Sequence, residues 1–522
     1  MDHDLAAAAA QARAALASGD QRALHYNTLA WERAVSGDAA HAAQYFQQAL
    51  RVDPRDPEAL VGLAGLARAT GRLSEAVRLC DSAIAAHPDY PEAWLERAFV
   101  LHAGGSMPAA QECYARVIAL VPDSAPAHAG LAALAAREGD RVVGREHALA
   151  ALAADPDNAI AAAALAALAL EAGDAEAARR LIAPLAARRP HADAERVQLH
   201  SVLGDAYDRL GDAPAAHAAY AQSKADFAAL HAVQFTDRPP HRAWIEAIDA
   251  ALPVLKPAVW SSAGPPPASA SACHLFVLSY PRSGNTLLEN VLASLPGVAA
   301  LEERPTLRAA DSAFLAEPAT GLAQLQRLVE PAAAAQRDAY WQAVTDAGVP
   351  SAARGFVDMD PLKGTRLPLI ARLFPDARVL LLRRDPRDVV WSCFRTNFAL
   401  TNAAMDFVTL ERAARHYAAL MTLIEHARAQ LPLNVHEVSY EALVRDFDAA
   451  TQAICEFAGL DWSEDLRRFD RTARQRGVST ASAGQVRKGL YDGSGQWRPY
   501  AEYLAPVLPI LAPWIERFGY AA

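Results

Sequence analysis

Two residue types recur every 34 positions in the first half of the chain, and this period constrains the fold more than any other feature. The recurring residues are Gly37, Gly71, Gly105, Gly139 and Gly173, and Pro54, Pro88, Pro122, Pro156 and Pro190. A glycine in each turn and a proline after each second helix are typical of repeats built from two helices. Such a repeat cannot bury its apolar face alone, so stacked repeats share a core and form a curved superhelix.

Side chains near these markers also alternate in size. Small residues recur where paired helices must approach (Ala42, Ala76, Ala110 and Ala178), and larger ones occupy a nearby position (Phe46, Tyr114 and Tyr220). The pattern resembles the tetratricopeptide repeat, with Trp94, Gly204 and Tyr207 at its signature positions. A sixth repeat follows after four additional residues, because Gly211 lies 38 residues after Gly173. The resemblance implies a groove that binds a peptide or partner protein; a spacer or an oligomerisation arm stays open.

The repeats predict the domain organisation. We expect an all-α helical-hairpin solenoid over residues 1–250, with about six repeats and a capping helix in residues 232–250. Residues 251–272 are rich in Pro, Ser and Ala and are predicted to form a linker. Residues 273–522 then form a second domain.

Composition and charge exclude several classes of function. The net charge is −10, and residues 1–272 carry 23 Lys and Arg against 32 Asp and Glu. Nucleic acid is therefore not an expected partner, because phosphate contacts require a basic face. No apolar run has the length of a membrane span, and the acidic N-terminus is unlike a secretory signal. Five scattered cysteines indicate neither disulfides nor a zinc site, so we predict a cytoplasmic protein.

The second domain opens with a strand, a short loop and a helix. An apolar run from Leu275 to Leu278 predicts a buried strand, and apolar residues from Leu287 to Leu292 have helical spacing. Between them lies the loop Tyr280-Pro281-Arg282-Ser283-Gly284-Asn285-Thr286. A loop that leads into a helix N-terminus binds anions through its free backbone N–H groups. Arg282, Ser283, Asn285 and Thr286 add side-chain donors.

A second strand-loop-helix pattern lies about a hundred residues on. The apolar strand Ala377–Leu382 ends in the charged turn Arg383-Arg384-Asp385-Pro386-Arg387-Asp388, and a helix with Ser392 follows. Ligands bind at such strand ends in open α/β sheets. The alternative interpretation of the same residues is an ordinary turn stabilised by salt bridges. Neither loop carries the lysine of a nucleoside-triphosphatase loop, so a kinase or nucleotidase is disfavoured.

Together the motifs resemble those of sulfotransferases that use 3′-phosphoadenosine 5′-phosphosulfate (PAPS), and most closely bacterial repeat-linked proteins similar to tyrosylprotein sulfotransferases. The resemblance implies a P-loop-like α/β domain with a parallel sheet. It implies that Arg282, Ser283, Gly284, Asn285 and Thr286 bind the 5′-phosphosulfate and that Arg384 and Ser392 bind the 3′-phosphate. Tyr440, Ser482 and Lys488 match further cofactor contacts. No metal is implied.

The resemblance also assigns candidate catalytic residues. Glu302 and Glu303 follow Arg282 by 20 and 21 residues, and Glu303 matches the general base. The family usually has a lysine where this chain has Met359, in the segment Asp358-Met359-Asp360-Pro361. Lys363 is a candidate replacement if one helical turn separates the two positions.

The predicted reaction is in-line transfer of a sulfuryl group from PAPS to a hydroxyl of a peptidyl tyrosine, a glycan or a small molecule. Glu303 would accept the proton, and Arg282, helped by Lys363, would stabilise the developing charge. The alternative is a non-catalytic repeat scaffold that carries a degenerate PAPS-binding domain, and Met359 is the feature that favours it.

Overall fold

The structure is a computed structural model of the 522-residue chain. It describes residues 2–188, 193–236, 238–260, 273–350, 353–476, 486 and 489–521. Its contacts divide the chain into two compact units, Met1–Leu210 and Gly211–Ala522, called here the repeat unit and the sheet unit. No helix in these ranges is long and apolar enough to cross a membrane.

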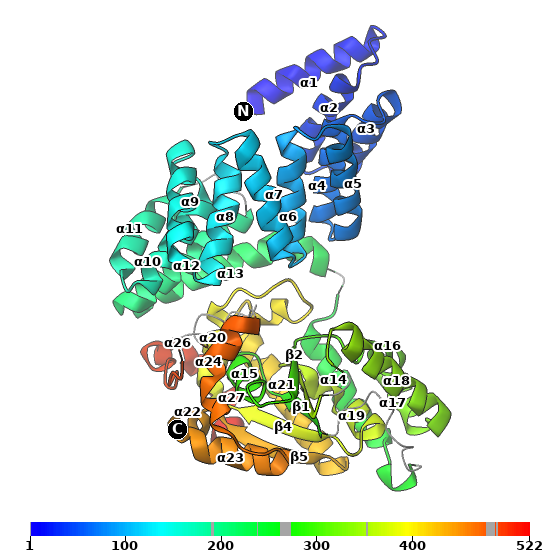
Figure 1. Cartoon of the computed structure of the whole chain (residues 1–522), viewed down its shortest axis with the longest axis vertical. Coiled ribbons are helices and arrows are strands. Elements are labelled where there is room, and N and C mark those ends of the chain that lie inside the picture. The colour runs from blue at the N-terminus through cyan, green and yellow to red at the C-terminus, as the bar shows by residue number, and fades with distance from the viewer. Residues whose placement is uncertain are drawn as a thin grey trace. The chain divides into compact units, whose positions relative to one another are not determined.

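The repeat unit consists of helices that pack against their neighbours in the sequence (Figure 1). These helices are α1 (Asp2–Ala17), α2 (Ala23–Val35), α3 (Ala39–Val52), α4 (Pro57–Ala69), α5 (Leu73–Ala86), α6 (Pro91–Ala103), α7 (Met107–Leu120), α8 (Ala125–Glu138), α9 (Arg141–Ala154), α10 (Ala159–Glu171), α11 (Ala175–Ala186) and α12 (Asp193–Leu210). The predicted repeat organisation is confirmed. Each marker glycine lies between two helices with a positive φ, between 75° and 86° for the five from Gly37 to Gly173, which is the turn conformation that favours glycine.

The core of the repeat unit is built largely from small side chains. Ala42, Ala76, Ala110 and Ala178 are fully buried, as predicted for positions where helices approach closely. Phe46 and Tyr114 fill the larger spaces, each against a glycine of the next helix. A Cβ atom at Gly62 would lie 2.2 Å from the Phe46 ring, and one at Gly130 would lie 2.4 Å from the Tyr114 ring. The glycines therefore make room for the aromatic rings.

The sheet unit has a parallel five-stranded sheet in the order β2-β3-β1-β4-β5. The strands are β1 (Cys273–Leu278), β2 (Val298–Glu302), β3 (Gly355–Met359), β4 (Arg378–Arg383) and β5 (Asn434–Ser439). This confirms the predicted α/β class with a parallel sheet.

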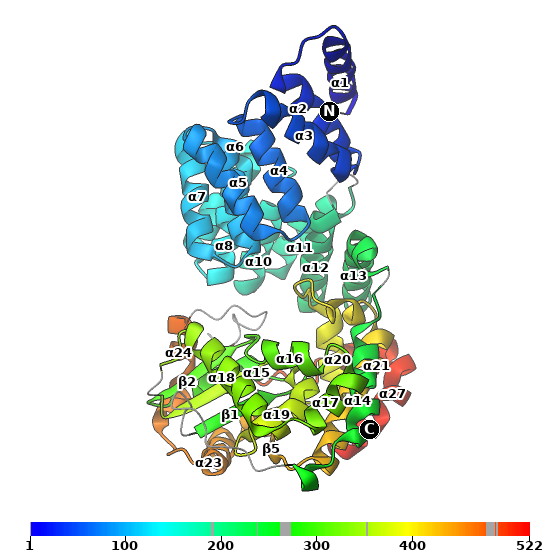
Figure 2. The ribbon, with the colours of Figure 1, turned by 90° about the vertical axis from the view of Figure 1, so that its right-hand side faces the viewer.

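Helices cover both faces of this sheet. The α-helices are α13 (Ala213–Phe235), α14 (His241–Ala251), α15 (Asn285–Leu292), α16 (Arg308–Phe314), α17 (Pro318–Gln326), α18 (Glu330–Asp346), α19 (Leu367–Leu373), α20 (Pro386–Arg395), α21 (Leu410–Gln430), α22 (Tyr440–Arg445), α23 (Phe447–Ala458), α24 (Phe469–Arg476), α26 (Ala501–Leu504) and α27 (Leu508–Arg517). The short 3₁₀ helices are η1 (Leu252–Val254), η2 (Pro257–Val259), η3 (Lys363–Arg366), η4 (Ala404–Phe407), η5 (Glu464–Arg468), η6 (Arg498–Tyr500) and η7 (Ala505–Val507). Figure 2 shows α16, α17, α18 and α19 grouped together within this unit.

The two sheet faces differ in chemistry. Leu275, Val277 and Met359 belong to an apolar core that they share with Leu288 of α15. The alternate residues of the same strands point the other way, where His274 contacts the Tyr340 hydroxyl at 2.7 Å and Asp358 accepts from the same hydroxyl at 2.9 Å. Strand side chains alternate between faces, so the polar cluster lies on the face opposite α15.

Two helices that the sequence groups with the repeats pack within the sheet unit. Lys224 of α13 is buried, and its Nζ donates to the Thr396 carbonyl at the end of α20 at 2.5 Å. His217 of α13 stacks on Tyr503 with ring centroids 3.9 Å apart. Helix α14, expected to cap the array, packs against α17 and α21. The domain boundaries predicted at residues 250 and 272 rest on the repeat pattern and on composition, and they stay predictions.

Candidate active site

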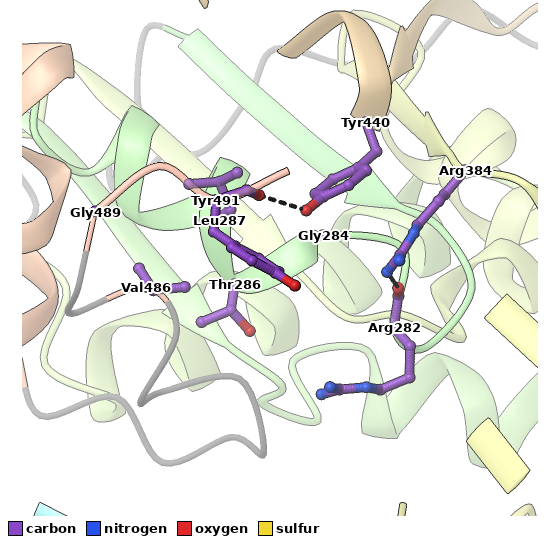
Figure 3. A pocket seen from close by; sticks show the side chains of 9 residues that line it. All are labelled: Arg282, Gly284, Thr286, Leu287, Arg384, Tyr440, Val486, Gly489 and Tyr491. Atoms are coloured by element: carbon purple, nitrogen blue, oxygen red, sulfur yellow. Dashed lines mark hydrogen bonds between the residues drawn. The ribbon is translucent and has the colours of Figure 1, made fainter. Parts of the chain in front are cut away.

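Three of the predicted binding segments follow adjacent strands. The loop with Arg282 follows β1, Arg384 follows β4, and Tyr440 follows β5, and these three strands are neighbours in the sheet. Because the strands are parallel, their carboxyl ends lie at one edge, where α/β proteins bind ligands. The structure thus brings Arg282, Gly284, Thr286, Arg384 and Tyr440 together around one pocket of about 470 Å³ (Figure 3).

The backbone of the first loop has an unusual conformation. Arg282 has a φ of 69° and Gly284 a φ of 104°. A Cβ atom at Gly284 would lie 2.6 Å from the Tyr440 ring, so this position requires glycine. Helix α15 begins directly after it, at Asn285. The backbone N–H groups of its first turn have no partner within the helix and face the loop.

Buried side chains hold the loop in place. The Asn285 amide donates to the Tyr280 carbonyl at 3.2 Å, and its other end contacts the Ser279 hydroxyl. The Tyr280 hydroxyl lies 2.7 Å from His416 Nδ1, and His416 Nε2 lies 2.8 Å from His241 Nδ1 of α14. Asn285 therefore supports the loop from inside. Ser283 is also buried and is not part of the pocket lining, and the predicted ligand contacts of both residues stay predictions.

Arg384 is buried and surrounded by the loop. Its Nη1 donates to the Arg282 carbonyl at 3.0 Å, its Nη2 donates to the Gly493 carbonyl, and its guanidinium lies 4.7 Å above the Tyr440 ring. The Asp388 carboxylate lies 3.7 Å away. The Nε atom of Arg384 is buried and has no hydrogen-bond partner among the described residues. Figure 3 shows Arg282 and Arg384 on one side of the pocket, with Val486 and Gly489 on the other.

Ser392 connects the second motif to the first. Its hydroxyl is buried and accepts from Arg282 Nε at 3.0 Å. Burial first, and then repulsion from the nearby cations Arg395 and Arg384, lower the pKa of Arg282 to about 10. Three guanidinium groups therefore concentrate positive charge at the strand ends, and a bound anion would relieve their repulsion.

A segment from Gly489 to Trp497 borders the pocket and is anchored by several side chains. The Asp388 carboxylate accepts from the backbone N–H groups of Gly495 at 2.7 Å and Trp497 at 2.9 Å. The Tyr440 hydroxyl donates to the Tyr491 carbonyl at 2.8 Å. The sequence pattern indicates Asp388 only as part of a salt-bridged turn and does not reveal this anchoring role. Two other predicted contacts, Ser482 and Lys488, lie outside the described residues.

The predicted base Glu303 lies just beyond β2. Its backbone N–H donates to the Met359 carbonyl at 2.8 Å and its φ is 50°, a left-handed value uncommon for glutamate. The pKa of its carboxyl group is raised to about 7, first by desolvation and then by repulsion from Asp360 and Glu302. Because Glu303 is exposed to solvent, water moderates these effects.

A further carboxylate, Glu289 of α15, was not singled out from the sequence. It is fully buried, and its Oε1 accepts from Arg476 Nη2 at 2.7 Å. Burial raises its pKa to about 7, with added repulsion from Glu302 and Glu303. The three carboxylates are therefore electrostatically linked. The sequence signal that could have identified Glu289 is its position directly after two leucines of an apolar helix, in Leu287-Leu288-Glu289.

Lys363 and Met359 lie on opposite faces of the sheet. Lys363 is buried, its Nζ pairs with the Asp358 carboxylate, and it also donates to the Thr306 hydroxyl at 3.4 Å. Asp358 belongs to the face opposite α15, whereas Met359 is in the core shared with α15. Lys363 is not among the residues that line the pocket. Its role as a replacement for the family lysine stays a prediction.

Comparisons with known proteins agree with this geometry. Residues 274–464 match the model of the sulfotransferase family, and residues 36–98 and 67–135 match the tetratricopeptide repeat. The sheet unit thus carries a sulfotransferase-family domain, and the repeat unit carries tetratricopeptide repeats.

A relative and several solved structures share parts of the chain. A protein of Aquifex aeolicus (strain VF5) with no stated function is 32% identical over 259 residues, which are 47% of this chain and 33% of the relative. The chain thus spans about a third of that relative's length. A thermophilic repeat protein of Thermus thermophilus is 23% identical, covering 35% of this chain and 98% of its own, with a TM-score of 0.31. PilW, a type IV pilus biogenesis factor, is 21% identical, covering 39% and 93%, with a TM-score of 0.34.

Proposed function

We propose that the sheet unit transfers a sulfuryl group from PAPS to an acceptor hydroxyl and that the repeat unit recruits a protein partner or substrate. The match to the sulfotransferase family supports the first part, and the repeats support the second. The observation that carries the proposal is the meeting of Arg282 and Arg384 beside the first turn of α15. A pocket that joins the buried Arg384 guanidinium, the half-buried Arg282 guanidinium and a helix N-terminus suits a polyanion.

The residues present fit a nucleotide with two phosphate-bearing ends. Arg384 has a buried Nε that lacks a partner among the described residues, so it retains donor capacity for a phosphate. Gly284 leaves room for the Tyr440 ring, which lines the same pocket. Leu287 and Val486 add apolar surface to the same pocket. PAPS, when bound, supplies an activated sulfuryl group attached to a 5′-phosphate.

Each residue has a separate proposed task. Arg282 and the N–H groups of α15 bind the 5′ end and stabilise the negative charge that develops there. Arg384 and Ser392 bind the 3′-phosphate. Glu303 accepts the proton of the attacking hydroxyl, and its raised pKa of about 7 suits a base at neutral pH. The acceptor is a peptidyl tyrosine, a glycan or a small molecule.

Calorimetry with the full chain tests the cofactor. We expect 3′,5′-diphosphoadenosine to bind at least about tenfold more tightly than AMP, since a hydrogen bond to a charged group contributes about 1.5–3 kcal/mol. Arg384→Met should remove this preference. Arg415→Met is the matched control, because Arg415 is exposed and pairs with Glu411 on the same helix. Equal affinity of the wild type for the two nucleotides would refute the assignment.

One observation favours a second candidate function, a repeat scaffold with a degenerate PAPS-binding domain. The family lysine position is Met359, fully buried in the core, and Lys363 is neutralised by Asp358. The two candidates differ in turnover. Labelled PAPS incubated with the protein and a heat-inactivated cell extract, followed by mass spectrometry, should yield a sulfated product only if the chain is an enzyme, and the product identifies the acceptor.

A further inference from the structure

A second pocket, of about 540 Å³, lies in the repeat unit between α2, α3, α4 and α6. The first helices of consecutive repeats contact one another, α2 with α4 and α4 with α6. The second helices, α3, α5 and α7, contact one another less, so the first helices lie on the inner side of the curved stack, the side on which repeat proteins bind partners. The pocket is therefore placed where a partner can enter.

The repeat period explains how the pocket forms. Trp31, Gly65, Phe99 and Ala133 are spaced by 34 residues and so occupy one structural position in consecutive repeats. Gly65 thus lies between two repeats that carry an aromatic side chain at this position. Trp31 is 36% exposed, a high value for tryptophan in a folded unit. The missing side chain at Gly65 leaves open space beside it.

Packing does not account for Gly65. Glycine is unfavourable inside a helix relative to alanine, and at Gly62, one turn earlier, the Phe46 ring requires it. At Gly65 a Cβ atom would meet only the Glu96 carboxyl group, at 3.7 Å, which is an ordinary contact. An alanine would fit and would favour the helix. Close approach by a bound group is a physical reason for glycine at this position.

The pocket walls are held in fixed positions. The Trp31 indole N–H donates to Glu58 Oε1 at 2.8 Å, and the ring meets Phe46 edge-on at 5.2 Å. At the other end, Arg68 Nε donates to Glu96 Oε1 at 2.6 Å. The Arg68 side chain is 36% exposed and the Glu96 side chain 11% exposed, so the accessible charge of this ion pair is the positive one.

We propose that this pocket binds an aromatic side chain of a partner peptide, with a carboxylate next to that side chain bound by Arg68. The apolar walls and the open space at Gly65 select a bulky flat group. The accessible guanidinium selects an acidic neighbour. The inference rests on the proposed partner-binding role of the repeat unit and not on sulfuryl transfer.

The test uses the full chain and short peptides observed by saturation-transfer NMR. The probes are acetylated and amidated Gly-Asp-Phe-Gly-Gly, the same peptide with Ala for Phe, and the same peptide with Asn for Asp. Burial of one aromatic side chain corresponds to a Kd in about the millimolar range. We expect the Asp-Phe peptide to bind, the Ala peptide to bind at least about tenfold more weakly, and the Asn peptide several-fold more weakly.

Matched variants locate the site. Gly65→Leu fills the pocket and should abolish binding, whereas Ala133→Leu places the same side chain at the equivalent position two repeats on and should leave binding unchanged. Gly65→Ala, which the helix accommodates, should weaken binding while raising the thermal midpoint, and it keeps the test valid if the leucine variant misfolds. The double variant Arg68→Gln, Glu96→Gln should bind the Asp and Asn peptides equally.

Three results would overturn the proposal: unchanged binding by Gly65→Ala and Gly65→Leu, equal binding of the Phe and Ala peptides, or equal binding of the Asp and Asn peptides to the wild type. Binding of 3′,5′-diphosphoadenosine is measured on the same variants. Because that site is in the sheet unit, absence of nucleotide binding by the wild type would refute the cofactor assignment without bearing on the pocket of the repeat unit.

Discussion

The two pockets are assembled in opposite ways. The pocket of the repeat unit comes from residues between Trp31 and Glu96, on helices that are neighbours in the sequence. The pocket of the sheet unit joins Arg282, Arg384, Tyr440 and Tyr491 from three strand ends and a later segment. A substitution in the repeat unit therefore disturbs contacts within its own and adjacent repeats. A substitution in the pocket of the sheet unit disturbs contacts between segments that are far apart in the chain.

The two units also differ in what fills their cores. Clusters in the repeat unit contain mainly alanine, such as Ala129, Ala151 and Ala161. The core under α15 contains Leu, Val, Tyr and Phe side chains. Small buried residues let helices approach closely but leave little apolar area to lose on truncation. The repeat unit is thus sensitive to added volume, and the sheet unit to removed volume.

The largest expected difference between the units is in turnover. Glu303→Gln should lower the rate of sulfuryl transfer by about 10²–10⁴ without affecting peptide binding by the repeat unit. Because the base must be deprotonated and its pKa is raised to about 7, the wild-type rate should rise with pH through neutrality and then level off. Steady-state rates with labelled PAPS measure both effects. Glu302→Gln is the control and should be much milder; identical losses in the two variants would contradict the role of Glu303.

Variants of Lys363 allow its contribution to stability to be measured separately from its contribution to catalysis. Lys363→Met leaves Asp358 buried without its cation and should lower the free energy of unfolding by about 3–5 kcal/mol, measured by denaturant titration. Asp358→Asn combined with Lys363→Met should recover much of the lost free energy of unfolding. If that stable double variant transfers sulfuryl groups at the wild-type rate, Lys363 has no part in the reaction. A rate that falls in the double variant and recovers on adding Met359→Lys would instead support its predicted replacement of the family lysine.

Glycines with positive φ should respond differently in the two units. Gly105→Ala places a Cβ atom in open space and should lower the free energy of unfolding by about 1–2 kcal/mol from backbone strain alone. Gly284→Ala adds a collision with the Tyr440 ring, for an additional cost of about 1–3 kcal/mol, and should weaken nucleotide binding. Thermal unfolding and calorimetry of the two variants provide the comparison. Equal losses would mean that the Tyr440 contact is easily relieved.

A further comparison concerns the membership of α13 in the sheet unit. Burial lowers the pKa of Lys224 from 10.5 to about 8, so the unfolded chain binds this proton more tightly than the folded chain. The free energy of unfolding should therefore rise between about pH 8 and pH 10.5, by at most about 1.4 kcal/mol per pH unit. Lys224→Met should remove this rise, and Lys256→Met, at an exposed position, should keep it. Hydrogen exchange in α20 should speed up only in the first variant.

Local pattern predicted the repeats and the strand ends, but not the contacts between distant segments. The glycine and proline period specified the helices and their turns because each repeat contacts its neighbours. The strand-loop-helix patterns placed Arg282 and Arg384 at strand ends, and the parallel sheet brings them together. The period could not show that α13, in register with a sixth repeat, packs against α20 through Lys224. The pairing of Lys363 with Asp358 depends on which face of β3 each side chain occupies, which spacing alone does not reveal.

The packing of α13 on α20 determines where the chain can be cut. A fragment that began at Cys273, the end of the composition-based linker, would lose α13 and α14 and expose Trp391, which contacts Tyr220 and His217. It would also leave His416 without His241, and Tyr280 of the loop after β1 contacts His416. Such a fragment should express as insoluble protein, whereas one that begins at Gly211 retains both helices and their buried aromatic contacts. The expression boundary of the sheet unit therefore lies within the last repeat, more than sixty residues before the first strand.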